Sequence, residues 1–186
     1  MQLMRGPRLI ARGQTGYYRL ENLEFDPLFA DPENPEAVRF CWNNTGNEDA
    51  KHYAETICDV DSALLTASAT KRTVIVNCFE GDTDFNQFDN LAFQPKTGNL
   101  YVVEDHENGD IFACLPDGKN RDIKTDGCVK MPSDKDSSAE PMGFFFTPDG
   151  KTAFVSIMHT DDTHMPKVDD WGTDDVLMIT GFRVKR

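Results

Sequence analysis

One short phrase occurs three times in this chain, and it constrains the fold more than any other feature. Its copies are ENLEFDP at residues 21–27, DNLAFQP at 89–95 and EPMGFFFTP at 140–148. In the second and third copies a glycine turn and a second apolar stretch follow, as in KTGNLYVV and DGKTAFVSI. Strand, Pro/Gly turn and strand together indicate a hairpin. A repeated hairpin predicts an all-β fold of similar units.

The repeats share a phenylalanine, at Phe25, Phe93 and Phe146. Their spacing leaves room for the roughly 40–50 residues of a four-stranded propeller blade, with insertions. We therefore expect a β-propeller segment of about three blades of antiparallel strands. A closed ring usually takes 4–8 blades, so we expect the segment to be part of a six-bladed ring. A β-sandwich with coincidental turns is the alternative.

Period-two alternation and apolar runs predict the individual strands. They are expected at residues 38–42, 73–76, 91–93, 100–103, 111–114, 144–146, 153–157 and 176–180. A longer loop, residues 26–37, interrupts the first copy, and only residues 49–69 are compatible with a short helix. We expect residues 1–186 to form a single propeller-like domain, a C-terminal fragment of a larger propeller.

The formal net charge is −13, while 39% of the residues are hydrophobic. The hydrophobic share supports a folded protein. The negative charge argues against nucleic acid or an anionic membrane as a partner, because both select basic surfaces. No apolar run has the length of a membrane span, and residues 1–8 lack the apolar core of a signal peptide.

The five cysteines match no zinc-site spacing. Cys114 and Cys128 flank a polar loop and are the first candidate for a disulfide; Cys58 and Cys78 are a weaker candidate pair. An odd count leaves at least one thiol outside intramolecular pairs. Buried free cysteines are an equal alternative to these disulfides.

Several familiar catalytic and metal motifs are absent. Residues 82–86 (DTDFN) begin like a calcium loop, but Gln87 and Phe93 stand where that loop needs glycine and glutamate. His159 and His164 do not form a helical zinc pair, and neither GxSxG nor a phosphate loop occurs. The polar residues that begin each repeat are the remaining candidates.

These leading residues are Arg19 and Glu21 in the first copy, Asp89 and Asn90 in the second, and Glu140 in the third. In a propeller the innermost strands line a central channel, so carboxylates at their entry ends would converge. Such an oxygen-rich site suits a hard cation such as calcium. A turn-capping role and a surface ion pair remain the structural alternatives.

At these residues the chain resembles the PhoX-type alkaline phosphatases, metal-dependent β-propeller phosphatases. The similar pieces occur in order over most of the chain and correspond to the C-terminal half of such a protein. They are residues 18–27, 38–46, 88–100, 103–105, 114–118, 126–128, 140–143 and 147–159.

The resemblance implies phosphomonoester hydrolysis with Ca²⁺ and Fe³⁺ at the ring centre. It gives Arg19 a phosphate-binding and catalytic role and Glu21 and Glu140 a metal-ligating one, although Leu20 stands where the family has proline. Weaker assignments are Asp89, Asn90 and Glu104 (with Asp105) for metal, Asn44 for substrate, and His159 for a catalytic, substrate-side role.

The resemblance also implies partners and a location. The substrate is a small phosphomonoester, the full-length proteins are periplasmic or secreted, and the missing N-terminal half is a possible partner. That half supplies an iron-bound cysteine, a role to which none of the five cysteines is assigned, so we expect an incomplete site here. The alternatives are a non-catalytic calcium-binding or scaffold propeller and a lactonase-like calcium propeller hydrolase.

Overall fold

A computed structural model describes residues 17–61, 74–114, 128–133, 139–158 and 174–184. These residues form eleven β-strands in three antiparallel sheets, with a single 3-10 turn and no α-helix among them. Nothing in this part of the chain is a helix long and apolar enough to cross a lipid bilayer.

Each sheet is a meander in which successive strands of the chain are neighbours. The first sheet contains β1 (Leu20–Phe25), β2 (Val38–Asn44), β3 (Glu55–Asp61) and β4 (Val74–Glu80). The second contains β5 (Phe88–Phe93), β6 (Leu100–Glu104), β7 (Asp110–Cys114) and β8 (Cys128–Ser133). The third contains β9 (Glu140–Phe146), β10 (Thr152–Met158) and β11 (Asp175–Thr180).

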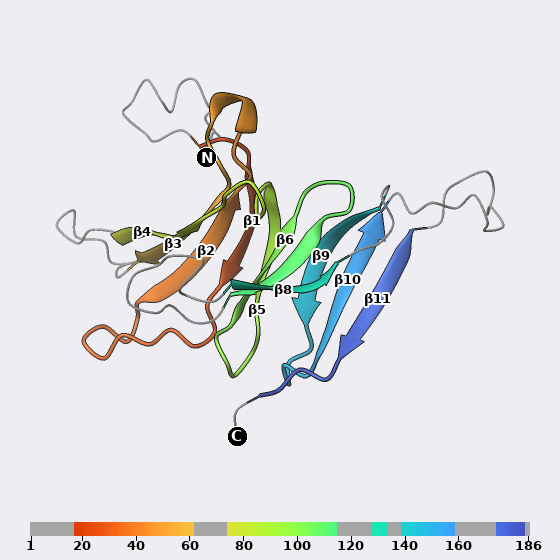
Figure 1. The fold of residues 1–186 in the computed structure, drawn as a ribbon. Helices are drawn as coiled ribbons and strands as arrows, with labels where there is room; N and C mark the ends of the chain where they lie inside the picture. Colours follow the sequence, from red (N-terminus) through yellow and green to blue (C-terminus); the bar gives the residue numbers. More distant parts are fainter. Residues whose placement is uncertain (1–16, 62–73, 115–127, 134–138, 159–173, 185–186) are drawn as a thin grey trace, which may run out of the picture.

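The three sheets lie beside one another like a fan, with the second sheet in the middle (Figure 1). The first strands of neighbouring sheets contact each other, β1 with β5 and β5 with β9. The beginnings of β1, β5 and β9 therefore gather in one region, and this gathering positions the candidate site.

In the second sheet, strands β6 and β7 are buried on both faces. Alternate residues of β6 point in opposite directions, so Leu100 and Val102 join the cluster toward the first sheet, while Tyr101 and Val103 join the cluster toward the third. Burial on both faces explains why β6 and β7 are almost continuously apolar. Each buried Val, Leu or Phe stabilises the fold by about 1.5–3 kcal/mol.

The predicted all-β class is confirmed, and so are both predicted hairpins, as β5–β6 and β9–β10. The long loop of the first copy joins β1 to β2, which form the corresponding hairpin. The strands expected near residues 38–42, 73–76, 111–114 and 176–180 are β2, β4, β7 and β11.

The helix considered for residues 49–69 is wrong over the described residues. Glu48–Ala50 is a 3-10 turn capped by the side chain of Asn47, and Glu55–Asp61 is strand β3. β3 lies between β2 and β4, and its residues 56–59 are buried there. This tertiary pairing outweighs the weak helical periodicity of the segment. Residues 62–69 lie outside the described part of the chain.

Two disulfides join neighbouring strands. The predicted pair Cys114–Cys128 is confirmed and links β7 to β8. The weaker prediction, Cys58–Cys78, is wrong, because Cys58 is bonded to Cys41. The reason is register: Cys41 lies directly opposite Cys58 across the β2–β3 ladder, whereas Val76 is the residue of β4 opposite Cys58.

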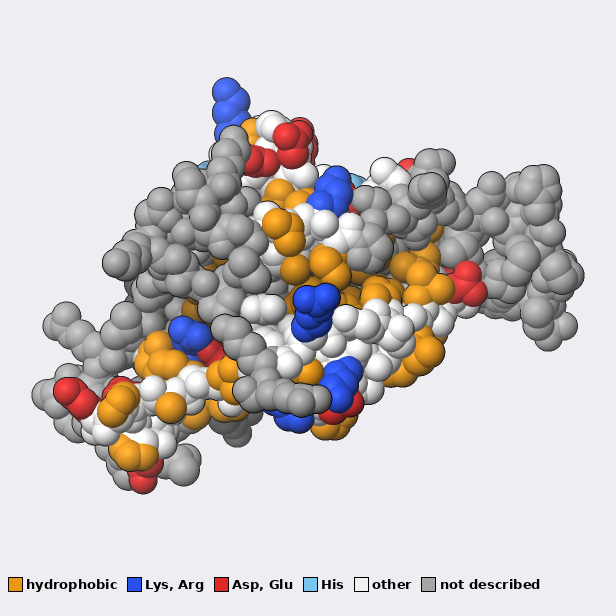
Figure 2. All heavy atoms as spheres, turned by 60° about the horizontal axis from the view of Figure 1, so that its bottom comes forward, with side chains coloured by type: hydrophobic (Ala, Val, Ile, Leu, Met, Phe, Trp, Pro, Cys, Tyr) orange, Lys and Arg blue, Asp and Glu red, His pale blue; other side chains and the backbone are white. Residues whose placement is uncertain are grey.

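The outer sheets expose hydrophobic side chains. In β1, Leu20 and Leu23 are each 57% exposed, and in β11, Val176 is 70% and Met178 63% exposed. Figure 2 shows hydrophobic side chains at the surface toward the right of the view, where Figure 1 places β10 and β11. Exposed apolar sheet surface of this kind is typical of faces that pack against another element.

Candidate functional site

Each innermost strand carries a β-bulge. Two residues of the inner strand face one residue of its neighbour at 21–22 in β1, 89–90 in β5 and 143–144 in β9. Bulges redirect side chains and are frequent beside functional sites. Because Glu21 and Asp89 begin the first two bulges, the two carboxylates occupy the same place in successive sheets.

The third copy departs from this register. Gly143 begins its bulge, and Glu140 lies three residues earlier, where it pairs with Met158 at the start of β9. The expectation that polar residues recur at one position in all three copies therefore holds for two of them. Glu140 still lies on the innermost strand of the third sheet, with its side chain half-buried.

A charged group gathers around the first two bulges. Arg19 precedes β1 with a left-handed backbone (φ 53°), and its Nε lies 3.7 Å from Oε1 of Glu21. Its guanidinium also forms an ion pair with Asp105, which follows the end of β6. Asp89 adds a third carboxylate, close enough for the charges of Arg19, Glu21 and Asp105 to affect it. We call Arg19, Glu21, Asp89 and Asp105 the central cluster.

The pKa of Asp89 reports the charge balance of the central cluster. Burial, followed by the negative charges of Asp105 and Glu21, raises the pKa of Asp89 from 3.8 to about 6, although Arg19 opposes the rise. Three carboxylates share a single guanidinium in this cluster. The excess negative charge makes it a place where a cation would be favourable.

Buried side chains of the first sheet hold the β5 bulge in place. The amide nitrogen of Asn43 donates to the backbone oxygens of Asp89 (3.0 Å) and Asn90 (3.1 Å). Thr56 in turn donates its hydroxyl to Oδ1 of Asn43 (2.7 Å). Thr45 donates its hydroxyl to the oxygen of Phe88 (2.8 Å). The position of Asp89 is therefore set by hydrogen bonds from another sheet.

Asn90 links the second bulge to the third. Its Oδ1 accepts a hydrogen bond from the backbone N–H of Gly143, which has a left-handed backbone (φ 59°). A glycine adopts this conformation without steric cost. The side chain of Asn90 thus ties β5 to β9 at the edge of the candidate site.

Glu104 has a different environment from its neighbour Asp105. Its side chain is buried, Oε1 accepts from the N–H of Asn86 (2.8 Å), and Oε2 accepts from the N–H of Asp110 (3.0 Å). His106 Nε2 lies 3.3 Å from Oε2, and the hydrogen bond to Glu104 raises the pKa of His106 to about 9. Glu104 therefore anchors the loops beside β6 and lines a separate cavity of about 540 Å³.

Two further predicted residues are Asn44 and His159. Asn44 ends β2, is buried, and donates its amide to Oε1 of Glu55 (2.9 Å). It lines a cavity of about 360 Å³ with Tyr17, Tyr18 and His52. His159 lies outside the described residues.

The structure adds two residues to those that the sequence singled out most strongly. Asp105 was a second-choice candidate together with Glu104, and of the two it is Asp105 that pairs with Arg19. Asn43 carried no predicted role, although it holds the Asp89 bulge. Strand alternation is the sequence signal for Asp105. Because β6 ends at Glu104, the side chains of Glu104 and Asp105 point to different sides. No sequence signal identifies Asn43.

Comparison with known proteins gives one match. The family profile described as "Alkaline phosphatase PhoX" matches residues 45–161, more than half of the chain. Searches of the curated proteins and of the solved structures found no significant match to this chain. The matched residues include the second repeat, with Asp89 and Asp105, and the third, with Glu140. The chain therefore belongs to the PhoX alkaline phosphatase family.

Proposed function

We propose that this chain supplies part of a metal-dependent centre that hydrolyses small phosphomonoesters. The observation that carries the proposal is the central cluster, in which a guanidinium and three carboxylates meet at the beginnings of the innermost strands. A metal-dependent phosphatase needs a cationic group for the phosphate and oxygen ligands for metal. The central cluster contains both.

The donor chemistry fits a hard cation. Glu21, Asp89 and Asp105 offer carboxylate oxygens, the ligands that Ca²⁺ prefers. Burial first, and then the neighbouring carboxylates, raise the pKa of Asp89, and a bound cation would lower that pKa and displace the proton. When bound, Ca²⁺ and Fe³⁺ would neutralise phosphoryl oxygens and polarise the ester. The choice of Fe³⁺ rests on the family resemblance.

Arg19 is the proposed phosphate ligand. Its side chain is 56% exposed, so a phosphate arriving from solvent can reach the guanidinium. Arginine binds phosphate with two parallel N–H donors, and a charge-assisted pair of this kind replaces the ion pair to Asp105. The exchange would leave Asp105 available to a cation. In a protein of net charge −13, this guanidinium also offsets the repulsion of a dianionic ester.

The remaining predicted residues are ranked by whether their side-chain oxygens already accept hydrogen bonds from backbone N–H groups. Glu21 and Asp89 are the foremost metal ligands, and Glu140 is proposed as a ligand from the third sheet. Asn90 and Glu104 already accept hydrogen bonds from backbone N–H groups, which gives them a positioning role first. Asn44 and His159 remain proposals for the substrate side.

The three sheets are proposed to be three blades of a larger β-propeller, with residues 1–186 as one domain of it. The contacts between the innermost strands support this arrangement. The exposed apolar side chains of β1 and β11 support packing of further sheets against both ends of the fan. The N-terminal half typical of the family is the proposed source of those sheets, and six blades the proposed total.

The test is hydrolysis of p-nitrophenyl phosphate by the complete propeller that contains this chain, supplied with Ca²⁺ and Fe³⁺, followed by the same assay on Arg19→Ala. We expect kcat/KM of Arg19→Ala to fall by about two orders of magnitude, because a charge-assisted phosphate contact strengthened in the transition state is worth about 3 kcal/mol. Lys151→Ala, a change in an exposed turn, is the control and should retain full activity.

The alternatives give different results. Calcium binding without hydrolysis would favour the non-catalytic propeller, and hydrolysis of a lactone in place of the phosphate ester would favour the lactonase-like enzyme. Equal activity in Arg19→Ala and the wild type would remove the catalytic proposal.

A further inference from the structure

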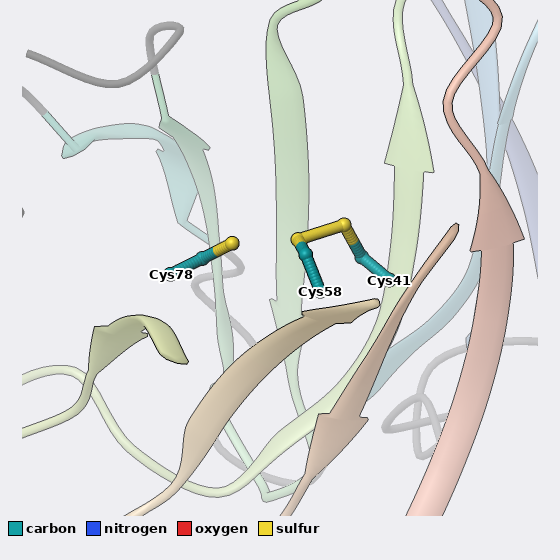
Figure 3. A group of neighbouring side chains, drawn as sticks. All are labelled: Cys41, Cys58 and Cys78. Atoms are coloured by element: carbon teal, nitrogen blue, oxygen red, sulfur yellow. A yellow bond between two sulfur atoms is a disulfide. The ribbon is translucent and has the colours of Figure 1, made fainter. Parts of the chain in front are cut away.

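Three cysteine sulfurs of the first sheet lie close together, and none of these cysteines is among the residues proposed for catalysis. The Sγ atoms of Cys41, Cys58 and Cys78 all lie within 4.8 Å of one another. Cys41 and Cys58 form a disulfide, and Cys78 carries a thiol and is half-buried. Figure 3 shows the side chain of Cys78 pointing toward the Cys58 end of the disulfide.

The strand arrangement makes Cys58 the shared partner. Cys58 lies on β3, between Cys41 on β2 and Cys78 on β4. Cys78 is the extra residue of a β-bulge, because Asn77 pairs with Ile57 and Phe79 with Thr56. A bulge redirects a side chain out of the regular alternation. The regular register places only Cys41 opposite Cys58. The bulge in β4 brings the Cys78 thiol beside the same disulfide.

We propose that Cys41, Cys58 and Cys78 form an intramolecular thiol–disulfide exchange site. The Cys78 thiol loses its proton to solvent, and the thiolate attacks Sγ of Cys58. A Cys58–Cys78 bond forms as the Cys41–Cys58 bond breaks, and Cys41 leaves as a thiolate that takes up a proton. One disulfide and one thiol are present before and after, so no external oxidant or reductant is needed.

The exchange moves a covalent link from β2–β3 to β3–β4. Cys41 lies two residues before Asn43 on the same face of β2, and Asn43 holds the β5 bulge. The released thiol therefore lies in the strand that positions Asp89. Cys114–Cys128 offers an internal comparison, because no third cysteine of the described residues lies in a sulfur group with that disulfide.

Disulfide mapping tests the proposal. The wild-type protein, purified without reductant, is incubated at mildly alkaline pH and then acidified. Thiols are alkylated with N-ethylmaleimide and the peptides analysed by mass spectrometry. We expect a second population with time, in which Cys58 is linked to Cys78 and Cys41 is alkylated. In Cys78→Ser, Cys41 and Cys58 should be linked only to each other, with alkylated Cys41 absent.

Two results would overturn the proposal. In the first, Cys41 never becomes alkylated and all label remains on Cys78. In the second, new links include Cys114 or Cys128, which indicates scrambling through unfolded protein. Cys41→Ser provides an independent readout: it should form Cys58–Cys78 on oxidation in air, at a rate independent of protein concentration. If N-ethylmaleimide still labels both Cys58 and Cys78 of Cys41→Ser after oxidation, the exchange site is also contradicted.

Discussion

Asp89 shows how a single residue reports on the candidate centre. Its backbone oxygen is held by Asn43, while its carboxylate lies near two like charges and one arginine. The pKa rises to about 6 because burial and those charges disfavour the ionised form. Perturbed carboxyl groups of this kind are frequent at functional sites, where a ligand compensates the charge.

The first prediction concerns the pH dependence of Asp89. The folded protein binds the Asp89 proton more tightly than the unfolded chain, so the free energy of unfolding falls as the pH rises from about 4 to about 6. Asp89→Asn removes this loss. In EDTA, we expect the variant to have a Tm about 2–4 °C above the wild type at pH 8 and an equal Tm below pH 4.

Thermal melts at several pH values check this expectation. A pH-independent difference between the two proteins would mean that the substitution acts through packing, and a lower Tm for Asp89→Asn at pH 8 would contradict the raised pKa.

Sequence reasoning reached this residue but not its partner. Asp89 was visible because it repeats the place of Glu21. Asp105 follows Glu104 directly, and only the end of β6 decides which of the two carboxylates faces Arg19. The choice between adjacent residues depends on strand register, which composition and spacing do not determine.

At the scale of elements, the bulges of neighbouring sheets are joined by side chains. Asn43 of β2 binds the β5 bulge, and Asn90 of that bulge binds Gly143 in the β9 bulge. The repeated phrase predicted the hairpins β5–β6 and β9–β10, and both are present. It did not predict β3, β8 or the Cys41–Cys58 bond, because these depend on long-range pairing between strands that carry no repeat.

The second prediction tests the network that holds the β5 bulge. Asn43→Ala leaves two backbone oxygens and the Thr56 hydroxyl without these hydrogen bonds, so we expect the free energy of unfolding to fall by about 2–4 kcal/mol. Thr56→Val removes a single bond and should cost about 1 kcal/mol.

Urea denaturation of both single variants and the double variant measures their coupling. A shared network predicts an interaction energy of about 0.5–3 kcal/mol. Additive losses would show that Thr56 and Asn43 contribute independently, against the arrangement described above.

At the scale of the whole molecule, three antiparallel sheets place their first strands side by side. Strands β6 and β7 of the middle sheet are buried on both faces, and the outer sheets expose apolar side chains. The family match and this architecture agree with the propeller proposal. In that arrangement the central cluster faces the channel, and other blades would complete its ligands.

The central claim is that Glu21 and Asp89 bind a cation, and calcium-dependent thermal stability tests it most directly. A ligand at about 100 times its Kd stabilises the folded state by about 2.7 kcal/mol, so wild-type Tm should rise by roughly 5–10 °C. The doubly substituted Glu21→Gln/Asp89→Asn protein should show no rise, while Glu33→Gln, an exposed loop change, should behave as the wild type. An equal rise in the double variant, or none in the wild type, would contradict the account.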